Sequence, residues 1–167
     1  MPDSLPELSA RVVAGLGAAG FRLTLAESLT GGLIASSLVD VPGASRVLVA
    51  GVVAYDDAAK AQILGVGGGV LDQFGAVSEQ TAQAMAGGAR GLVTIAGVAD
   101  SKLVAVSTTG VAGPDMQEGK PVGQVHIAVA TDASITVRSF RFDGDRASIR
   151  LQAAVAALEL LLEEIAA

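Results

Sequence analysis

"TLAESLTGGLIASSL", Thr24 to Leu38, is the stretch that decides the fold. An apolar, strand-like run stops at a glutamate, two hydroxyl residues and a glycine pair before a helix-like segment begins. The N-terminus of such a helix leaves backbone N–H groups without partners, so the turn could hold an anion beside Ser28. On this stretch alone, an ordinary N-cap at Ser28 or Thr30 is the better interpretation, because hydroxyl residues are common at caps.

The flanking patterns alternate between strand and helix. Apolar residues at helical spacing predict helices that begin near residues 4, 33, 57, 78 and 145, with a short helical turn at 71–74. Apolar runs predict strands over 21–26, 47–55 and 102–108, the second of them an interior strand that ends at Tyr55. A hairpin is expected from 123–130 and 134–142. This order predicts one α/β domain over 1–167, a three-layer α/β/α sandwich with a mixed sheet and a late β-hairpin.

Composition excludes several classes of protein. The 167 residues carry a net charge of -6, and the 11 cationic residues are scattered, which argues against nucleic acid as a partner. The chain has no cysteine, so disulfides and zinc-thiolate sites are excluded. The start lacks the layout of a signal peptide, and no charge-free apolar run reaches the ~18 residues of a membrane span. A soluble, cytoplasmic protein without membrane contact is expected.

Three motifs are misleading. "GLGAAG", residues 15–20, matches a dinucleotide fingerprint, but a helix precedes it and a strand follows, the reverse of the required order. "GPDMQEGKP", residues 113–121, has the wrong spacing for a phosphate-binding P-loop. His126 is the only histidine and lies in an alternating strand, where a structural role is the better interpretation.

Polar residues follow three of the predicted strands. Ser28 follows the first, and Tyr55 ends the second, with Lys60 early in the next helix. "STTGVAGP", residues 107–114, repeats the sequence of strand, hydroxyl residues and glycine. Open α/β sheets bind ligands beyond the carboxyl ends of their strands, so these segments are expected to meet at one edge. A lysine removed from water there could act as general base toward a serine, although a solvated helix residue is about as good an interpretation of Lys60.

Several segments together resemble the CinA C-terminal domain family. They are "AESLTGGLIASSLVDVPGAS", "GVVAYDDAAKAQILGV", "GAVSEQTAQAMAGGAR", "TTGVAGP", "KPVGQVHIAVA" and "DGDRASIR", in the family's order and over nearly the whole chain. The resemblance implies a nicotinamide-nucleotide amidase, which converts nicotinamide mononucleotide and water to nicotinate mononucleotide and ammonia with neither metal nor cofactor. At this length the chain is expected to lack the family's N-terminal domain.

The resemblance also implies roles for individual residues. Ser28 would be the nucleophile, with Tyr55 and Lys60 activating it. Thr109 would be a substrate or oxyanion contact. Independently of the resemblance, further substrate or oxyanion contacts are expected at Glu27, Thr30, Gly31, Gly32, Gly110 and Gly113. The phosphate could be held by glycine-rich amide clusters or by Arg146, for which a surface arginine in the first turn of a helix is an equally good interpretation. The sequence departs from the family pattern at Leu29, where a cysteine is frequent, and in the acidic "DMQE" of residues 115–118.

The sequence leaves open an alternative function and the oligomeric state. A nucleotide-binding module without catalysis would need the glycine loops, but not Ser28, Tyr55 and Lys60 together. Small-residue helix faces, such as the one formed by Ala82, Ala86 and Ala89, allow a homodimer or higher homo-oligomer.

Overall fold

A five-stranded mixed sheet lies at the centre of the structure, a computed structural model that describes residues 4–166. The strand order is β2-β1-β3-β4-β5, with β1 parallel to β2 and β3, and with β4 antiparallel to both β3 and β5. The strands are β1 (Arg22–Glu27), β2 (Leu48–Val53), β3 (Leu103–Gly110), β4 (Gln124–Ala130) and β5 (Ile135–Arg141). The predicted mixed sheet and late hairpin are therefore confirmed.

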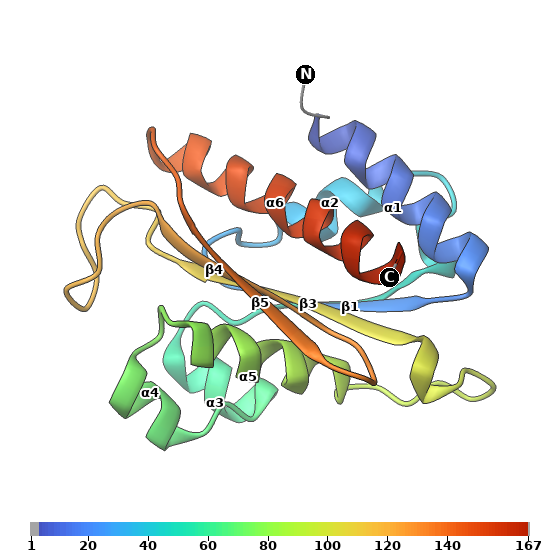
Figure 1. Cartoon of the computed structure of the whole chain (residues 1–167), viewed down its shortest axis with the longest axis horizontal. Helices are drawn as coiled ribbons and strands as arrows, with labels where there is room; N and C mark the ends of the chain where they lie inside the picture. Colours follow the sequence, from blue (N-terminus) through green and yellow to red (C-terminus); the bar gives the residue numbers. More distant parts are fainter. Residues whose placement is uncertain (1–3, 167) are drawn as a thin grey trace.

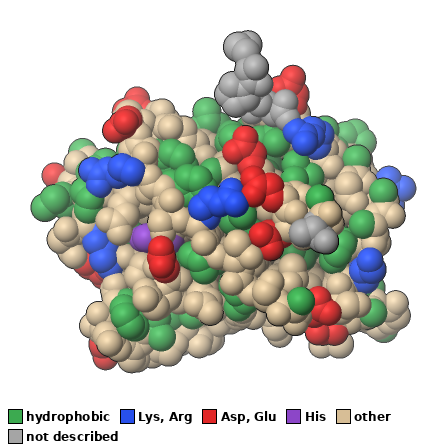
Figure 2. All heavy atoms as spheres, viewed as in Figure 1, with side chains coloured by type: hydrophobic (Ala, Val, Ile, Leu, Met, Phe, Trp, Pro, Cys, Tyr) green, Lys and Arg blue, Asp and Glu red, His purple; other side chains and the backbone are tan. Residues whose placement is uncertain are grey.

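Helices cover both faces of this sheet (Figure 1). One layer consists of α1 (Leu5–Ala19), α2 (Leu33–Val39) and α6 (Arg146–Ala166). The other layer consists of α3 (Asp57–Leu64), α4 (Gly68–Phe74) and α5 (Glu79–Arg90). The predicted three-layer α/β/α arrangement is confirmed. On the face shown in Figure 2, the Lys and Arg side chains lie apart from one another rather than in one patch. No helix within residues 4–166, including the 21-residue α6, is both long and apolar enough to cross a membrane.

The helix boundaries follow from capping residues in the sequence. Ser78 Oγ accepts a hydrogen bond from the Thr81 amide at 3.1 Å at the start of α5. At the start of α3, Asp56 Oδ1 accepts one from the Ala58 amide at 2.8 Å. Each bond satisfies an N–H group that the helix itself leaves unpaired. One boundary was predicted wrongly, because α4 begins at Gly68, inside the glycine-rich connector.

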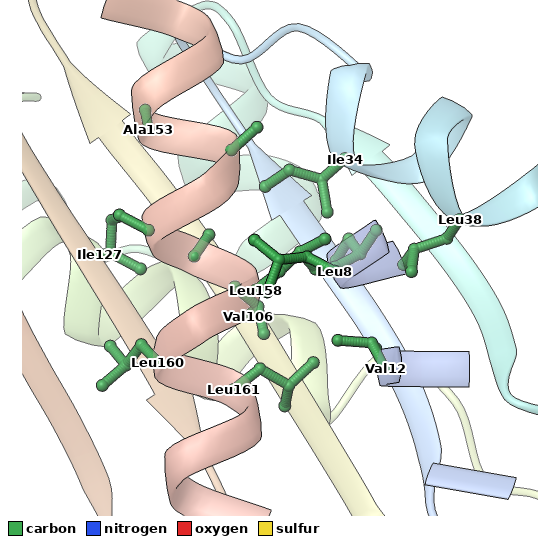
Figure 3. Close-up of a cluster of buried hydrophobic side chains, with 14 of the residues drawn as sticks. Leu8, Val12, Ile34, Leu38, Val106, Ile127, Ala153, Leu158, Leu160 and Leu161 are labelled. Atoms are coloured by element: carbon green, nitrogen blue, oxygen red, sulfur yellow. The ribbon is translucent and has the colours of Figure 1, made fainter. Parts of the chain in front are cut away.

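Two apolar cores flank the sheet. The larger one joins α1, α2 and α6 to the sheet through Leu, Ile and Val side chains, of which Leu8, Ile34, Val106, Ile127 and Leu158 are central (Figure 3). The second core lies under α5 and is built mostly from alanine. Ala82, Ala86 and Ala89 belong to it and are each 0% exposed. These three alanines pack against the sheet, so their face of α5 is not open to a second copy. The expected homo-oligomer stays a prediction.

The position of β2 differs from the prediction. Its apolar run indicated an interior strand, yet β2 forms one edge of the sheet. Both of its faces are partly covered, since Ala35 of α2 lies against Gly51 on one side and Val52 packs against the second core on the other. Val53, at the end of the strand, is 48% exposed. Partial cover on both faces accounts for the apolar pattern, which carries no information about whether a strand has one neighbour or two.

Candidate active site

The carboxyl ends of β1, β2 and β3 converge on one polar cavity of about 150 Å³. Its walls are formed by Ser28, Leu29, Tyr55, Lys60, Ala76, Val77, Thr109, Gly110, Val111, Ala112, Gly113, Asp115, Gln117 and Arg146. The expectation that three strand ends meet is confirmed, and it follows from the parallel pairing of β1 with both neighbours. Asp115 and Gln117 were not expected among these residues.

Ser28 lies in a tight turn directly after β1. Its amide donates to the Thr108 carbonyl at 3.0 Å, and its own carbonyl accepts from the Gly31 amide at 3.0 Å. The residue is only 7% exposed. Its hydroxyl has no hydrogen-bond partner among residues 4–166, and it is therefore available to a molecule in the cavity.

Glu27 fills the anion site that the sequence suggested for a substrate. Its carboxylate accepts hydrogen bonds from the amides of Gly32, Ile34 and Ala35 at 2.9–3.2 Å. A carboxylate at a helix N-terminus satisfies unpaired N–H groups and is favoured by the helix dipole. The first turn of α2 therefore has its anion within the chain, and Glu27, 1% exposed, does not reach the cavity.

Three more expected contacts lie outside the cavity for related reasons. The Thr30 hydroxyl shares a 2.8 Å hydrogen bond with the Thr108 hydroxyl in the interior. Gly31 and Gly32 adopt positive φ angles of 59° and 90° to make the turn, and their amides are already engaged. The structure thus gives Thr30, Gly31 and Gly32 a part in shaping the turn that holds Ser28, rather than contact with the cavity.

Arg150 holds the same turn from the opposite side, and sequence reasoning missed it. From α6, its Nε donates to the Leu29 carbonyl at 2.9 Å and its Nη2 donates to the Thr30 carbonyl at 2.8 Å. Arg150 follows Arg146 by one helical turn, so both point toward the same edge of the sheet. That spacing in "DRASIR" was the one available signal.

Lys60 is buried at the cavity wall, only 2% exposed. Its Nζ donates to the Tyr55 carbonyl at 3.3 Å and lies 3.6 Å from Asp57 Oδ1. The carboxylate of Asp57 is half-exposed, so water weakens its attraction for the amine. The structure therefore favours the interpretation of Lys60 as a lysine removed from water over that of a solvated helix residue.

Tyr55 corrects the expectation of a side chain at the end of a buried strand. It lies beyond the end of β2 and is 60% exposed. Its hydroxyl accepts a 2.7 Å hydrogen bond from Arg146 Nη2, while Arg146 Nη1 donates to the Gly113 carbonyl. The Tyr55 hydroxyl is thus joined to Arg146 at the rim of the cavity, whereas Lys60 contacts only the Tyr55 backbone.

The end of β3 forms the opposite wall. The Thr109 hydroxyl donates to the Ala76 carbonyl at 2.6 Å and fixes that wall. Gly110 has to be glycine, because a Cβ there would lie 2.7 Å from Val125 and 2.8 Å from the Gln124 carbonyl. The unusually acidic loop also has a structural explanation, since Glu118 accepts a 3.0 Å hydrogen bond from the Ala76 amide.

His126 lies outside the cavity, as the structural interpretation predicted. Its Nδ1 is 2.7 Å from Ser139 Oγ, which donates to Glu79 Oε1 at 2.6 Å, and its Nε2 is 3.1 Å from Gln124 Nε2. Burial lowers the pKa of His126 below its ordinary value of 6.5; Glu79 opposes this shift and Lys120 adds to it. No group of three or more His, Asp and Glu residues within 4–166 is placed to hold a metal ion.

The lowered pKa of His126 predicts a loss of stability in mild acid. The unfolded chain takes up a proton as pH falls through about 6.5, whereas the folded chain resists protonation until a lower pH. The free energy of unfolding should therefore fall between pH 7.5 and pH 5.5, and by less in His126→Gln. Urea unfolding of both proteins at both pH values measures this difference. An equal pH dependence in the two proteins would contradict it.

The fold and cavity define an open α/β protein with a serine and a lysine at the carboxyl ends of its parallel strands. Residues 5–165 match the CinA C-terminal domain, and the chain belongs to this family. It is 46% identical over 162 residues to nicotinamide-nucleotide amidohydrolase PncC of Enterobacter agglomerans, covering 96% of this chain and 94% of that protein.

Other relatives are longer proteins. A putative competence-damage inducible protein of Desulforamulus reducens is 49% identical over 142 residues, which cover 85% of this chain but 33% of that protein. The chain thus spans about a third of the length of several curated relatives that it matches.

Solved structures share the whole fold. The competence damage-inducible protein A (ComA) from Klebsiella pneumoniae superposes with a TM-score of 0.90 at 36% identity, covering 98% of both chains. The competence/damage inducible protein CihA from Agrobacterium tumefaciens gives a TM-score of 0.88 at 39% identity, covering 98% of this chain and 96% of that one.

Proposed function

We propose that this protein hydrolyses the carboxamide of nicotinamide mononucleotide, releasing ammonia and nicotinate mononucleotide. The observation that carries the proposal is that one cavity holds both the Ser28 hydroxyl, which has no partner within residues 4–166, and the buried amine of Lys60. The Enterobacter agglomerans relative, a nicotinamide-nucleotide amidohydrolase by name, aligns over nearly the whole chain and supports this choice of substrate.

Ser28 and Lys60 would carry out the acyl transfer. Lys60, as the neutral amine, takes the proton of the Ser28 hydroxyl while Oγ forms a bond to the carboxamide carbon. The C–N bond then breaks, and the proton passes from Lys60 to the leaving nitrogen, which departs as ammonia. In the second half, Lys60 accepts a proton from water, which attacks the acyl-enzyme and frees the acid; the proton returns to Ser28. Such general base help contributes ~10²–10⁴ in rate.

The oxyanion of the tetrahedral intermediate needs N–H donors at the cavity. The amides at the start of α2 already donate to the Glu27 carboxylate, so they are not available to the oxyanion. Other N–H groups at the cavity would have to bind it. The amides of Leu29, Ala112 and Gly113 border the cavity and have no hydrogen-bond partner among the described residues. Leu29 directly follows the nucleophile, the position that supplies an oxyanion donor in other serine hydrolases.

The size of the cavity suggests which part of the nucleotide would enter it and which part would stay outside. A volume of about 150 Å³ is small beside the ~300–1,000 Å³ of whole-ligand pockets. The nicotinamide ring would therefore enter the cavity, and the ribose phosphate would lie across the rim. Arg146 is exposed at that rim and keeps further N–H groups beyond those bonded to Tyr55 and Gly113, so we assign the phosphate to it.

A comparison of three substrates tests the proposal. Ammonia release should be fast from nicotinamide mononucleotide, at least ~10² slower in kcat/KM from nicotinamide riboside, which lacks the phosphate, and slowest from free nicotinamide. Binding of the mononucleotide is measured in parallel by calorimetry. A folded protein that binds the mononucleotide and releases no ammonia would overturn the enzyme and leave a nucleotide-binding module.

A further inference from the structure

A second cavity, of about 520 Å³, lies at the opposite end of β1 from Ser28. Arg22, the first residue of β1, lines it, together with the C-terminal part of α1 and the segment around residues 41–46. The catalytic cavity follows the last residue of the same strand, and no residue lines both cavities. The second cavity is therefore separate from the proposed active site.

Two arginines without partners line this cavity. Arg22 and Arg46 make no hydrogen bond or ion pair with any residue in the described range 4–166. The Nε of Arg22 is enclosed and has no acceptor, an arrangement that costs free energy because water cannot replace one. By contrast, Arg90 and Arg138 each pair with a carboxylate, at 2.8 and 2.7 Å.

The absence of local acidic partners is unexpected for this chain. It has 17 acidic residues against 11 basic ones, yet no Asp or Glu lines the second cavity. Two of the last carbonyls of α1 already accept backbone hydrogen bonds, since Gly20 donates to Gly17 and Phe21 donates to Leu16 at 2.9 Å. The two guanidinium groups thus have no anion within the described chain.

The remaining walls are apolar. Val13 of α1, Phe21 and Val41 contribute hydrophobic surface beside the two arginines. A third cation is close, because Lys102 Nζ lies 4.6 Å from the centre of the Phe21 ring. The volume falls within the range of small-molecule sites, which combine apolar walls with a few charged groups that fix orientation.

We propose that this cavity binds a small organic anion, with a carboxylate or phosphate between Arg22 and Arg46 and an apolar body against Phe21 and Val41. The guanidinium group presents N–H donors in a planar fork that matches both kinds of oxyanion. The site is independent of the acyl-transfer chemistry and would exist whether or not the chain hydrolyses nicotinamide mononucleotide.

Amide NMR titrations test the site with phenyl phosphate and benzoate as probes and phenol as the neutral control. Saturable shifts are expected at Phe21, Arg22, Val41 and Arg46 with one or both anions and not with phenol. The stronger of the two probes identifies the oxyanion. Because phenyl phosphate can also enter the catalytic cavity, shifts around Thr109 are followed separately.

Arginine variants decide the outcome. In the double variant Arg22→Gln/Arg46→Gln, the better probe should bind at least tenfold more weakly, as measured from the amide shifts of Phe21 and Val41. Arg46→Gln, an exposed change that keeps the fold, should weaken it several-fold. Arg141→Gln is the matched control, since Arg141 also lacks a partner within residues 4–166 but lies on β5, and it should bind as the parent does. Equal binding in the parent and Arg46→Gln, or shifts confined to the catalytic cavity, would overturn the proposal.

Discussion

Ser28→Ala should lower ammonia release from nicotinamide mononucleotide by about 10³-fold or more, because removal of a nucleophile leaves only the contribution of binding and of the oxyanion donors. The loss should appear in kcat. Calorimetric binding of the mononucleotide should persist, since the Ser28 hydroxyl holds no other group in the described chain. A coupled assay for ammonia, sensitive enough to follow rates down to about one part in 10⁴ of the parent, makes the measurement.

The matched control for this variant is Ser36→Ala. Ser36 lies on α2, eight positions further along the chain, and its side chain is exposed. It should retain the rate and stability of the parent. Parental turnover in a folded Ser28→Ala protein would leave the amidase possible but would eliminate Ser28 as the nucleophile.

Lys60→Met should lower kcat by about 10²–10⁴-fold, the usual contribution of a general base. Methionine has a length similar to that of lysine and suits a site that is 2% exposed, so the variant should fold and resist urea as well as the parent does. Loss of rate without loss of stability would separate a chemical role of the amine from a packing role.

Chemical rescue sharpens the test of Lys60. In Lys60→Ala, added methylamine should restore part of the rate, with a dependence on pH that follows the neutral amine. Lys102→Met is the control, because Lys102 lies over the Phe21 ring beside the second cavity and should not affect turnover. A Lys60→Met protein with a rate within threefold of the parent would exclude the lysine as the base.

The convergence of Ser28, Lys60 and Thr109 could be predicted because it depends on topology. Ser28 and Lys60 follow apolar strands and Thr109 lies at the end of one, and parallel strands bring their carboxyl ends to one edge. The edge position of β2 could not be predicted in the same way. Apolar residues on both sides of a strand report covered faces, and a face can be covered by helices whether or not another strand is hydrogen-bonded beside it.

The hydrogen bonds around the cavity were harder to predict than the residues that line it. Glu27 and the glycine pair form the pattern of an anion site, but sequence does not reveal that the chain's own carboxylate occupies it. The contact from Arg150 to Leu29 spans 121 residues, and its one signal in the sequence is the spacing of Arg150 one helical turn after Arg146. Tyr55, Gly110, Gly113 and Arg146 all line the cavity, and the roles expected of them stay predictions.

The turn that carries Ser28 is fastened at two points, by the Glu27 carboxylate to the start of α2 and by the Arg150 guanidinium to α6. The conformational entropy of this turn is therefore lost when the chain folds, before any ligand is present. Under the proposed function, a substrate that enters the cavity would meet a hydroxyl already in position, and association would require no further ordering of the backbone around it. Loosening either attachment would transfer that entropic cost from the folding reaction to each catalytic cycle.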